Sequence, residues 1–180
     1  MAQALKLAAL GGRAVAPNPM VGAVIVKNSK VIGKGYHQKF GGPHAEVLAI
    51  KSVEHKADLN GAILYITLEP CRHYGKTPPC LDLVKKVGIT HIICGSADPF
   101  QKGRRPKSTS FIKGPVATKC NNLNKFYFTW VTKKRPYITV KIASSTNGFV
   151  AGSNKEPVHF TTKTQDKYVH QLRVQHQAIV

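Results

Sequence analysis

Residues 44–53 read HAEVLAIKSV and directly follow Pro43. The apolar residues of this stretch recur at the spacing of one helix face. Proline is favoured at the start of a helix, so we predict that a helix begins at His44. Residues two apart on a helix do not share a side, but in a first turn both can meet a pocket beyond the helix end. His44 and Glu46 are therefore expected at such a pocket.

Strands and helices alternate on both sides of this stretch. β-rich runs predict strands, and a short turn at residues 27–29 joins the first two as a hairpin. The predicted strands are residues 20–26, 30–36, 62–68 and 90–94, and the further predicted helices are residues 1–10 and 79–86. The order α-β-β-α-β-α-β predicts an α/β sheet covered by helices on both faces, with ligands at the loop ends.

The second half of the chain carries a weaker pattern. Residues 100–115 are rich in Lys, Arg, Ser and Gly and are predicted to form a loop. A helix is predicted at 122–131, and we interpret its aromatic face as core rather than as a platform for stacking bases. A strand is predicted at 137–142 and a last helix at 164–174.

Length and composition limit the class of protein. The 180 residues, 42% of them hydrophobic, suit one domain with a short extension and exclude disordered and collagen-like chains. No apolar run approaches the about 18 residues that a membrane span needs, so we expect a soluble, cytoplasmic protein without a membrane partner. The four cysteines suggest metal binding or catalysis before disulfides.

The charge is strongly positive. Lys and Arg number 27 against 8 Asp and Glu, a formal net charge of +19, and residues 99–155 hold no acidic residue. A negatively charged partner is expected on this ground.

One histidine and two cysteines form the strongest chemical pattern. His44 begins a predicted helix, Cys71 follows a predicted strand, and Cys80 begins the next predicted helix. One imidazole and two thiolates make a three-ligand zinc set that leaves a fourth position for water, as in catalytic zinc sites. Zinc lowers the pKa of its bound water to about 7, which predicts a zinc-bound hydroxide nucleophile. Glu46 is placed to move the proton.

A histidine, an acid two residues later, and a Pro-Cys followed by a second cysteine form the signature of zinc nucleobase deaminases. Here eight residues, 72–79, separate the two cysteines rather than two. These eight residues are rich in donors and are predicted to line the pocket.

Further motifs resemble the bifunctional riboflavin-biosynthesis deaminase-reductase family over residues 1 to about 99. They are Pro17-Asn18-Pro19-Met20-Val21-Gly22, Gly33-Lys34-Gly35-Tyr36-His37, Gly42-Pro43-His44-Ala45-Glu46, Thr67-Leu68-Glu69-Pro70-Cys71 and Gly75-Lys76-Thr77-Pro78-Pro79-Cys80. The spacing of the cysteines separates this family from cytidine, guanine and transfer-RNA deaminases.

The resemblance implies a three-layer αβα, cytidine-deaminase-like sandwich with a mixed sheet. It also implies one zinc ion on His44, Cys71 and Cys80, with Glu46 as the catalytic proton shuttle. The implied reaction is hydrolytic deamination of 2,5-diamino-6-ribosylamino-4(3H)-pyrimidinone 5′-phosphate. The implied substrate contacts are Asn18, His37, His73, Lys76, Thr77 and Asp98.

The sequence departs from the family after Asp98. Phe100 stands where the family usually has asparagine, and the following basic residues do not predict the last strand and helix of the sandwich. Resemblance resumes at Arg135-Pro136-Tyr137, like the start of the family's reductase domain. We therefore expect a deaminase domain at 1–120 and a truncated reductase-like part at 121–180. No glycine-rich phosphate loop follows Lys141, so NADPH binding and reductase activity are not expected.

Two alternatives stay open. The charge suits a deaminase of polynucleotides, although the cysteine spacing disfavours it. The departure at Phe100 suits a degenerate zinc- or nucleic-acid-binding protein without catalysis, against which the retained Glu46 argues. A homo-oligomer also stays open.

Overall fold

The computed structural model describes residues 1–74, 78–101, 106–154 and 156–180. These residues divide into two compact units, 1–137 and 138–180. The division between units thus follows Tyr137, whereas the domain boundary after residue 120 stays a prediction.

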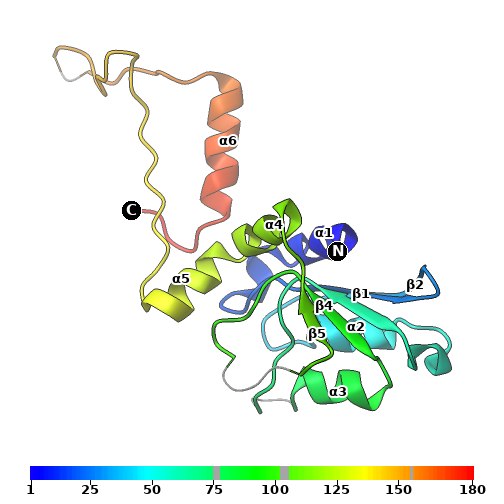
Figure 1. Cartoon of the computed structure of the whole chain (residues 1–180). Helices are drawn as coiled ribbons and strands as arrows, with labels where there is room; N and C mark the ends of the chain where they lie inside the picture. The colour runs from blue at the N-terminus through cyan, green and yellow to red at the C-terminus, as the bar shows by residue number, and fades with distance from the viewer. Residues whose placement is uncertain (75–77, 102–105, 155) are drawn as a thin grey trace. The chain divides into compact units, whose positions relative to one another are not determined.

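The first unit is built on a five-stranded mixed sheet (Figure 1). Its strand order is β2-β1-β3-β4-β5. The strands are β1 Gly22–Lys27, β2 Lys30–Tyr36, β3 Ile63–Ile66, β4 His91–Cys94 and β5 Thr109–Phe111. β1 pairs antiparallel with both β2 and β3, while β3, β4 and β5 run parallel. The predicted hairpin and the four predicted strands are confirmed.

Helices cover both faces of the sheet, as predicted. α2 (Ala45–Lys51) and α3 (Cys80–Lys86) lie on one face, and α1 (Ala2–Ala9) and α4 (Pro115–Leu123) lie on the other. Two short 3-10 helices are Gly12–Val15 and Lys56–Leu59. The core between the sheet and α2 and α3 holds Ile25, Leu64, Ile66, Ile92 and Val84, all essentially inaccessible to solvent.

The loop predicted for residues 100–115 is wrong in part. Thr109–Phe111 forms β5, which pairs with β4 at the sheet edge, and α4 begins directly after it with Pro115 in its first turn. The chain therefore has the last strand and helix of the sandwich. A strand of three residues, none of them fully buried, is too short to produce an alternating pattern in the sequence.

A glycine sets the distance between β2 and α2. A Cβ atom at Gly35 would lie 2.3 Å from the amide nitrogen of Ala49 and 2.6 Å from the carbonyl oxygen of Ala45. Both atoms belong to the backbone of α2, which cannot give way as a side chain can. The close approach places α2, and with it His44 at its N-cap, directly against the sheet.

We expect Gly35→Ala to destabilise the fold by about 1–3 kcal/mol, the usual cost of overpacking a core. Urea unfolding followed by circular dichroism measures the change. The matched control is Lys34→Ala, because Lys34 is the exposed neighbour on the same strand. Equal unfolding midpoints for the two variants would contradict the tight contact between β2 and α2.

The helix predicted at 122–131 is divided between the end of α4 and α5 (Lys125–Lys133). α5 contains no buried residue, and Trp130 is 54% exposed. The interpretation of its aromatic face as core is therefore wrong, because this helix lies at the surface rather than on the sheet. A nucleic-acid partner for these basic and aromatic side chains stays a prediction.

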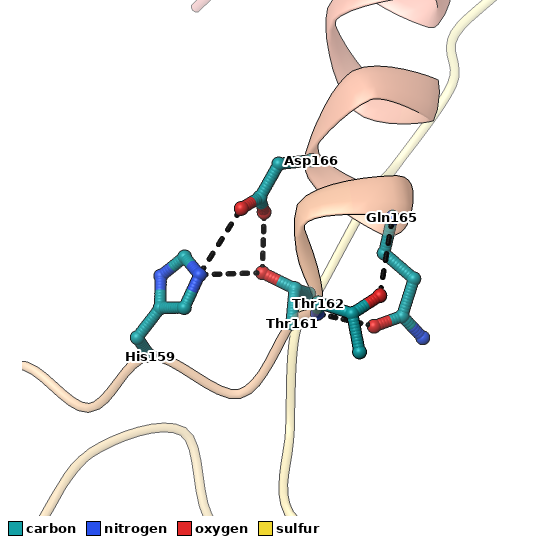
Figure 2. Close-up of polar contacts among 5 residues, drawn as sticks. All are labelled: His159, Thr161, Thr162, Gln165 and Asp166. Carbon is teal, nitrogen blue, oxygen red and sulfur yellow. Dashed lines mark hydrogen bonds and ion pairs between the residues drawn. The ribbon is translucent and has the colours of Figure 1, made fainter.

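The second unit contains the predicted C-terminal helix, α6 (Lys163–Val174). A capping box between Thr162 and Gln165 begins it, and Asp166 accepts a hydrogen bond from the Thr161 hydroxyl and contacts His159 (Figure 2). These contacts fix the start of the helix.

The strand predicted at 137–142 is wrong: its residues form no ladder with any part of the chain that the structure describes. Its alternating side chains lack a sheet to pack on, and Val140 is 76% exposed. Within the described ranges, each helix is too short or too polar to cross a lipid bilayer.

Candidate metal centre and active site

Three chain segments meet at one edge of the sheet. The parallel strands β3 and β4 both end there, so the residues that follow them become neighbours. Glu69 donates its backbone N–H to Ser96 O at 3.0 Å. Because β1 is antiparallel to β3, its start lies at the same edge, where Gly22 N–H donates to Thr67 Oγ1 at 3.1 Å.

His44, Cys71 and Cys80 converge at this edge, as the sequence predicts. Their ligand atoms, one imidazole nitrogen and two sulfurs, all lie within 4.8 Å of one another. Nδ1 of His44 is 3.1 Å from Cys80 Sγ and 3.8 Å from Cys71 Sγ. A tetrahedral zinc ion with ordinary bond lengths sets nitrogen and sulfur ligands about 3.5 Å apart. The three atoms therefore have the spacing of a zinc ligand set.

The local backbone holds the two cysteines together. Cys80 is the first residue of α3, and its N–H donates to Cys71 Sγ at 3.2 Å. The N–H of Leu81 donates to the carbonyl of Cys71 at 3.2 Å. One free amide of the helix start, that of Cys80, thus donates to the Cys71 sulfur, which favours the thiolate form.

The two thiols shift each other's pKa in opposite directions. A hydrogen bond from the Cys80 thiol, joined by one from His44, lowers the pKa of Cys71. The same pairing with Cys71, together with burial, raises the pKa of Cys80. A divalent metal ion needs both sulfurs as thiolates, so its binding would release any proton that they hold. The donor set fits zinc, which prefers nitrogen and sulfur ligands in tetrahedral sites.

Glu46 is buried beside these ligands. It is the second residue of α2, after His44 at the N-cap and Ala45, and it is 3% exposed. Burial raises the pKa of Glu46 to about 7, and the nearby Cys71 adds to this effect. A carboxyl group with this pKa both accepts and releases a proton near neutral pH.

His37 and Asn18 form a second polar pair at the site. His37 Nδ1 faces the carbonyl of Pro43 at 3.0 Å, so this nitrogen carries the proton. Nε2 then accepts from Asn18 Nδ2 at 3.1 Å. Burial lowers the pKa of His37, which keeps the ring neutral. The ring meets that of His44 edge to face with centroids 5.6 Å apart, which places the pair next to the ligand set.

Asp98 is buried and is engaged by protein donors. Its Oδ1 accepts from the Phe100 N–H at 3.0 Å and from the Tyr127 hydroxyl at 3.1 Å, and its Oδ2 accepts from Gln101 Nε2 at 3.0 Å. Neither Tyr127 nor Gln101 is predicted as a site residue from the sequence. The Tyr127 bond depends on the approach of α5 to a distant loop, which no local pattern signals, whereas Gln101 lies only three residues after Asp98.

Glu69 is a third buried acid at the site, after Glu46 and Asp98, and it is not predicted as a site residue from the sequence. Its carboxylate pairs with the Arg72 guanidinium at 3.3 Å and accepts from the Asp98 N–H at 3.3 Å. Its place between a strand end and Cys71 is the one sequence signal that marks it.

The remaining predicted contacts lie on the loop after Cys71. His73 is exposed, and its ring packs edge to face on Phe100 with centroids 5.0 Å apart. Lys76 and Thr77 lie outside the described residues. The roles of His73, Lys76 and Thr77 toward a substrate stay predictions, as do those of Asn18, His37 and Asp98.

Residues 1–96 match the family described as the cytidine and deoxycytidylate deaminase zinc-binding region. The chain belongs to this deaminase family. The match includes the segments that carry His44, Glu46, Cys71 and Cys80, and zinc is the metal that the family and the donor set both indicate.

Two similar proteins both carry names from riboflavin biosynthesis or its deaminase step. A diaminohydroxyphosphoribosylamino-pyrimidine deaminase from Buchnera aphidicola subsp. Schizaphis graminum is 43% identical over 135 residues, which cover 71% of this chain and 90% of that protein. The riboflavin biosynthesis protein RibD of Actinobacillus pleuropneumoniae is 40% identical over 187 residues, which cover 100% of this chain and 49% of that protein.

A solved structure agrees with the fold. The crystal structure of a diaminohydroxyphosphoribosylaminopyrimidine deaminase/5-amino-6-(5-phosphoribosylamino)uracil reductase from Thermotoga maritima is 42% identical, with a TM-score of 0.80 over 96% of this chain and 51% of that chain. The predicted cytidine-deaminase-like sandwich is confirmed. The chain spans about half the length of the RibD relatives that it matches.

Proposed function

We propose that the chain catalyses the hydrolytic deamination of 2,5-diamino-6-ribosylamino-4(3H)-pyrimidinone 5′-phosphate, a step of riboflavin synthesis, with one zinc ion per chain. One observation carries the proposal: three convergent ligand atoms lie beside the buried carboxyl of Glu46. The 43% identity to a named deaminase, 90% of which is covered, supports the choice of substrate over other members of the family.

His44, Cys71 and Cys80 would hold the zinc ion. Zinc bound there would supply Lewis acidity and so ease the loss of a proton from the attacking water. Glu46 takes up that proton and delivers it to the pyrimidine ring. The same carboxyl then takes the remaining hydroxyl proton of the former water and delivers it to the amino group, which leaves as ammonia. Its pKa near 7 suits both transfers, because neither protonation state of the carboxyl is costly to reach.

The polar side chains around the ligand set are the proposed substrate contacts. The neutral His37 holds the Asn18 amide by one of its donors and leaves the amide oxygen of Asn18 available to a substrate donor. A lysine on the loop between the cysteines suits the substrate phosphate, since both are charged. The full proposed set is Asn18, His37, His73, Lys76, Thr77 and Asp98.

Ammonia release tests the proposal. The zinc-loaded chain is expected to release ammonia from the diaminopyrimidine ribosyl phosphate, to lose this activity on chelation, and to regain it when zinc is returned. Cytidine, which lacks the phosphate and the second amino group, serves as the control substrate and is expected to give no comparable rate. A zinc-loaded chain that releases no ammonia from the diaminopyrimidine ribosyl phosphate would contradict the proposal.

A further inference from the structure

The first turn of α5 is tied to a loop at the edge of the site. The buried side chain of Asn124, at the N-cap of α5, donates from Nδ2 to the carbonyl of Met20 at 2.9 Å. Its Oδ1 accepts from the Met20 N–H at 2.8 Å. Two bonds from one amide fix both the position and the direction of this helix start. These bonds hold Met20, which lies two residues after Asn18 in the same loop.

Tyr127 follows one turn later and reaches a second loop. Its hydroxyl donates to Asp98 Oδ1 at 3.1 Å. Burial, and after it the neighbouring carboxylate of Asp98, raises the pKa of Tyr127, so the hydroxyl keeps its proton and stays a donor. Asn124 and Tyr127 are three residues apart and share a helix face, which lets one turn of α5 hold two loops.

Two further hydrogen bonds connect Asp98 to Arg72, the residue next to the predicted metal ligand Cys71. Gln101 Nε2 donates to Asp98 Oδ2 at 3.0 Å, and its Oε1 accepts from the Arg72 N–H at 2.9 Å. Arg72 is the residue next to Cys71, and its guanidinium pairs with Glu69 on the other side of that cysteine. An unbroken series of hydrogen bonds therefore leads from the Tyr127 hydroxyl to the backbone beside the Cys71 thiolate.

We propose that Tyr127 is a positioning residue: through Asp98 and Gln101 its hydroxyl fixes the orientation of the Cys71–Arg72 backbone, and thereby of the Cys71 sulfur toward a bound metal. This inference rests on the proposed function for its catalytic meaning. The hydrogen bonds on which it is built join residues of this chain, so the positioning role can be tested without measuring turnover. Hydrogen bonds to a charged acceptor are among the stronger ones, so the loss of this one has a measurable effect.

The test replaces zinc with Co²⁺, whose thiolate charge-transfer and d–d absorption bands report the geometry of the sulfur ligands. Tyr127→Phe removes the hydroxyl and keeps the ring. The expected result is one cobalt ion per chain with shifted absorption bands, together with a fall in kcat/KM of about tenfold, the worth of a hydrogen bond to a charged group. The matched control is Thr132→Val, because the Thr132 hydroxyl bonds within α5 to Phe128 O. Its cobalt spectrum is expected to equal that of the unaltered chain.

Two further variants make the test sharper. Gln101→Met cuts the same series one link nearer to Cys71 and is expected to shift the cobalt bands in the same way, even if Tyr127→Phe does not fold. Asp98→Asn combined with Tyr127→Phe is expected to shift the bands no further than Asp98→Asn alone, since the hydroxyl acts through Asp98.

An unchanged cobalt spectrum in folded Tyr127→Phe, or an additive effect in the double variant, would overturn the proposal. The spectra keep this outcome separate from a failure of the proposed function. A chain without turnover whose bands still shift in Tyr127→Phe would support the positioning role and reject the reaction.

Discussion

Glu46→Gln is expected to lower the rate of deamination by at least about 100-fold, the usual contribution of a positioned general acid and base. Glutamine has nearly the same shape but cannot accept a proton and pass it on. Because Glu46 is buried and holds its proton with a pKa of about 7, it is the described carboxyl best placed for both transfers at the ligand set. The zinc content is expected to stay at one ion per chain.

Steady-state ammonia release and metal analysis of the same preparation measure both quantities. The control is Glu54→Gln, the same chemical change at an exposed position soon after α2. It is expected to leave rate and zinc content unaltered. A Glu46→Gln rate within a few-fold of the unaltered chain would show that another group moves the proton.

Cys80→Ala is expected to weaken zinc binding by at least about 100-fold and to lower the melting temperature of the zinc-loaded protein, because metal binding is coupled to folding. With one sulfur removed, His44 and Cys71 alone cannot complete the three-atom set. Cys80 is also the first residue of α3, so a bound metal ion would connect this helix start to that of α2.

Zinc titration with a competing chromophoric chelator and thermal unfolding with and without zinc test this expectation. Cys94→Ala is the matched control, since Cys94 is a fully buried cysteine in β4 that belongs to the core and not to the ligand set. This variant is expected to lose stability equally with and without zinc. One tightly held zinc ion in Cys80→Ala would contradict the ligand assignment.

The sequence predicts most of the scaffold at the site. The apolar spacing after His44 and the short runs before Cys71 and Cys94 are local signals, and the helices and strands they predict are present. The ligand set follows because each ligand stands at an element end, where a parallel sheet brings loops together.

What the sequence does not predict depends on distant contacts. The three-residue β5 exists because β4 offers an edge to pair with, and Trp130 is exposed because α5 packs beside the sheet's loops rather than on its face. Tyr127 bonds to a residue 29 positions away in the sequence, and Asn124 bonds to one 104 positions away. The periodicity of a sequence does not indicate such distant pairs.

The bonds that join Cys71 to Cys80 and Leu81 have a consequence for how such a site can diversify. They close the base of the segment 72–79 with backbone groups and a ligand sulfur, so both ends of this segment are set by the metal centre itself. Its interior can then change in length and composition while the ligands keep their places. Because we propose that residues 72–79 line the substrate pocket, we expect that exchanging them for those of another family member changes the substrate preference and leaves zinc binding in place.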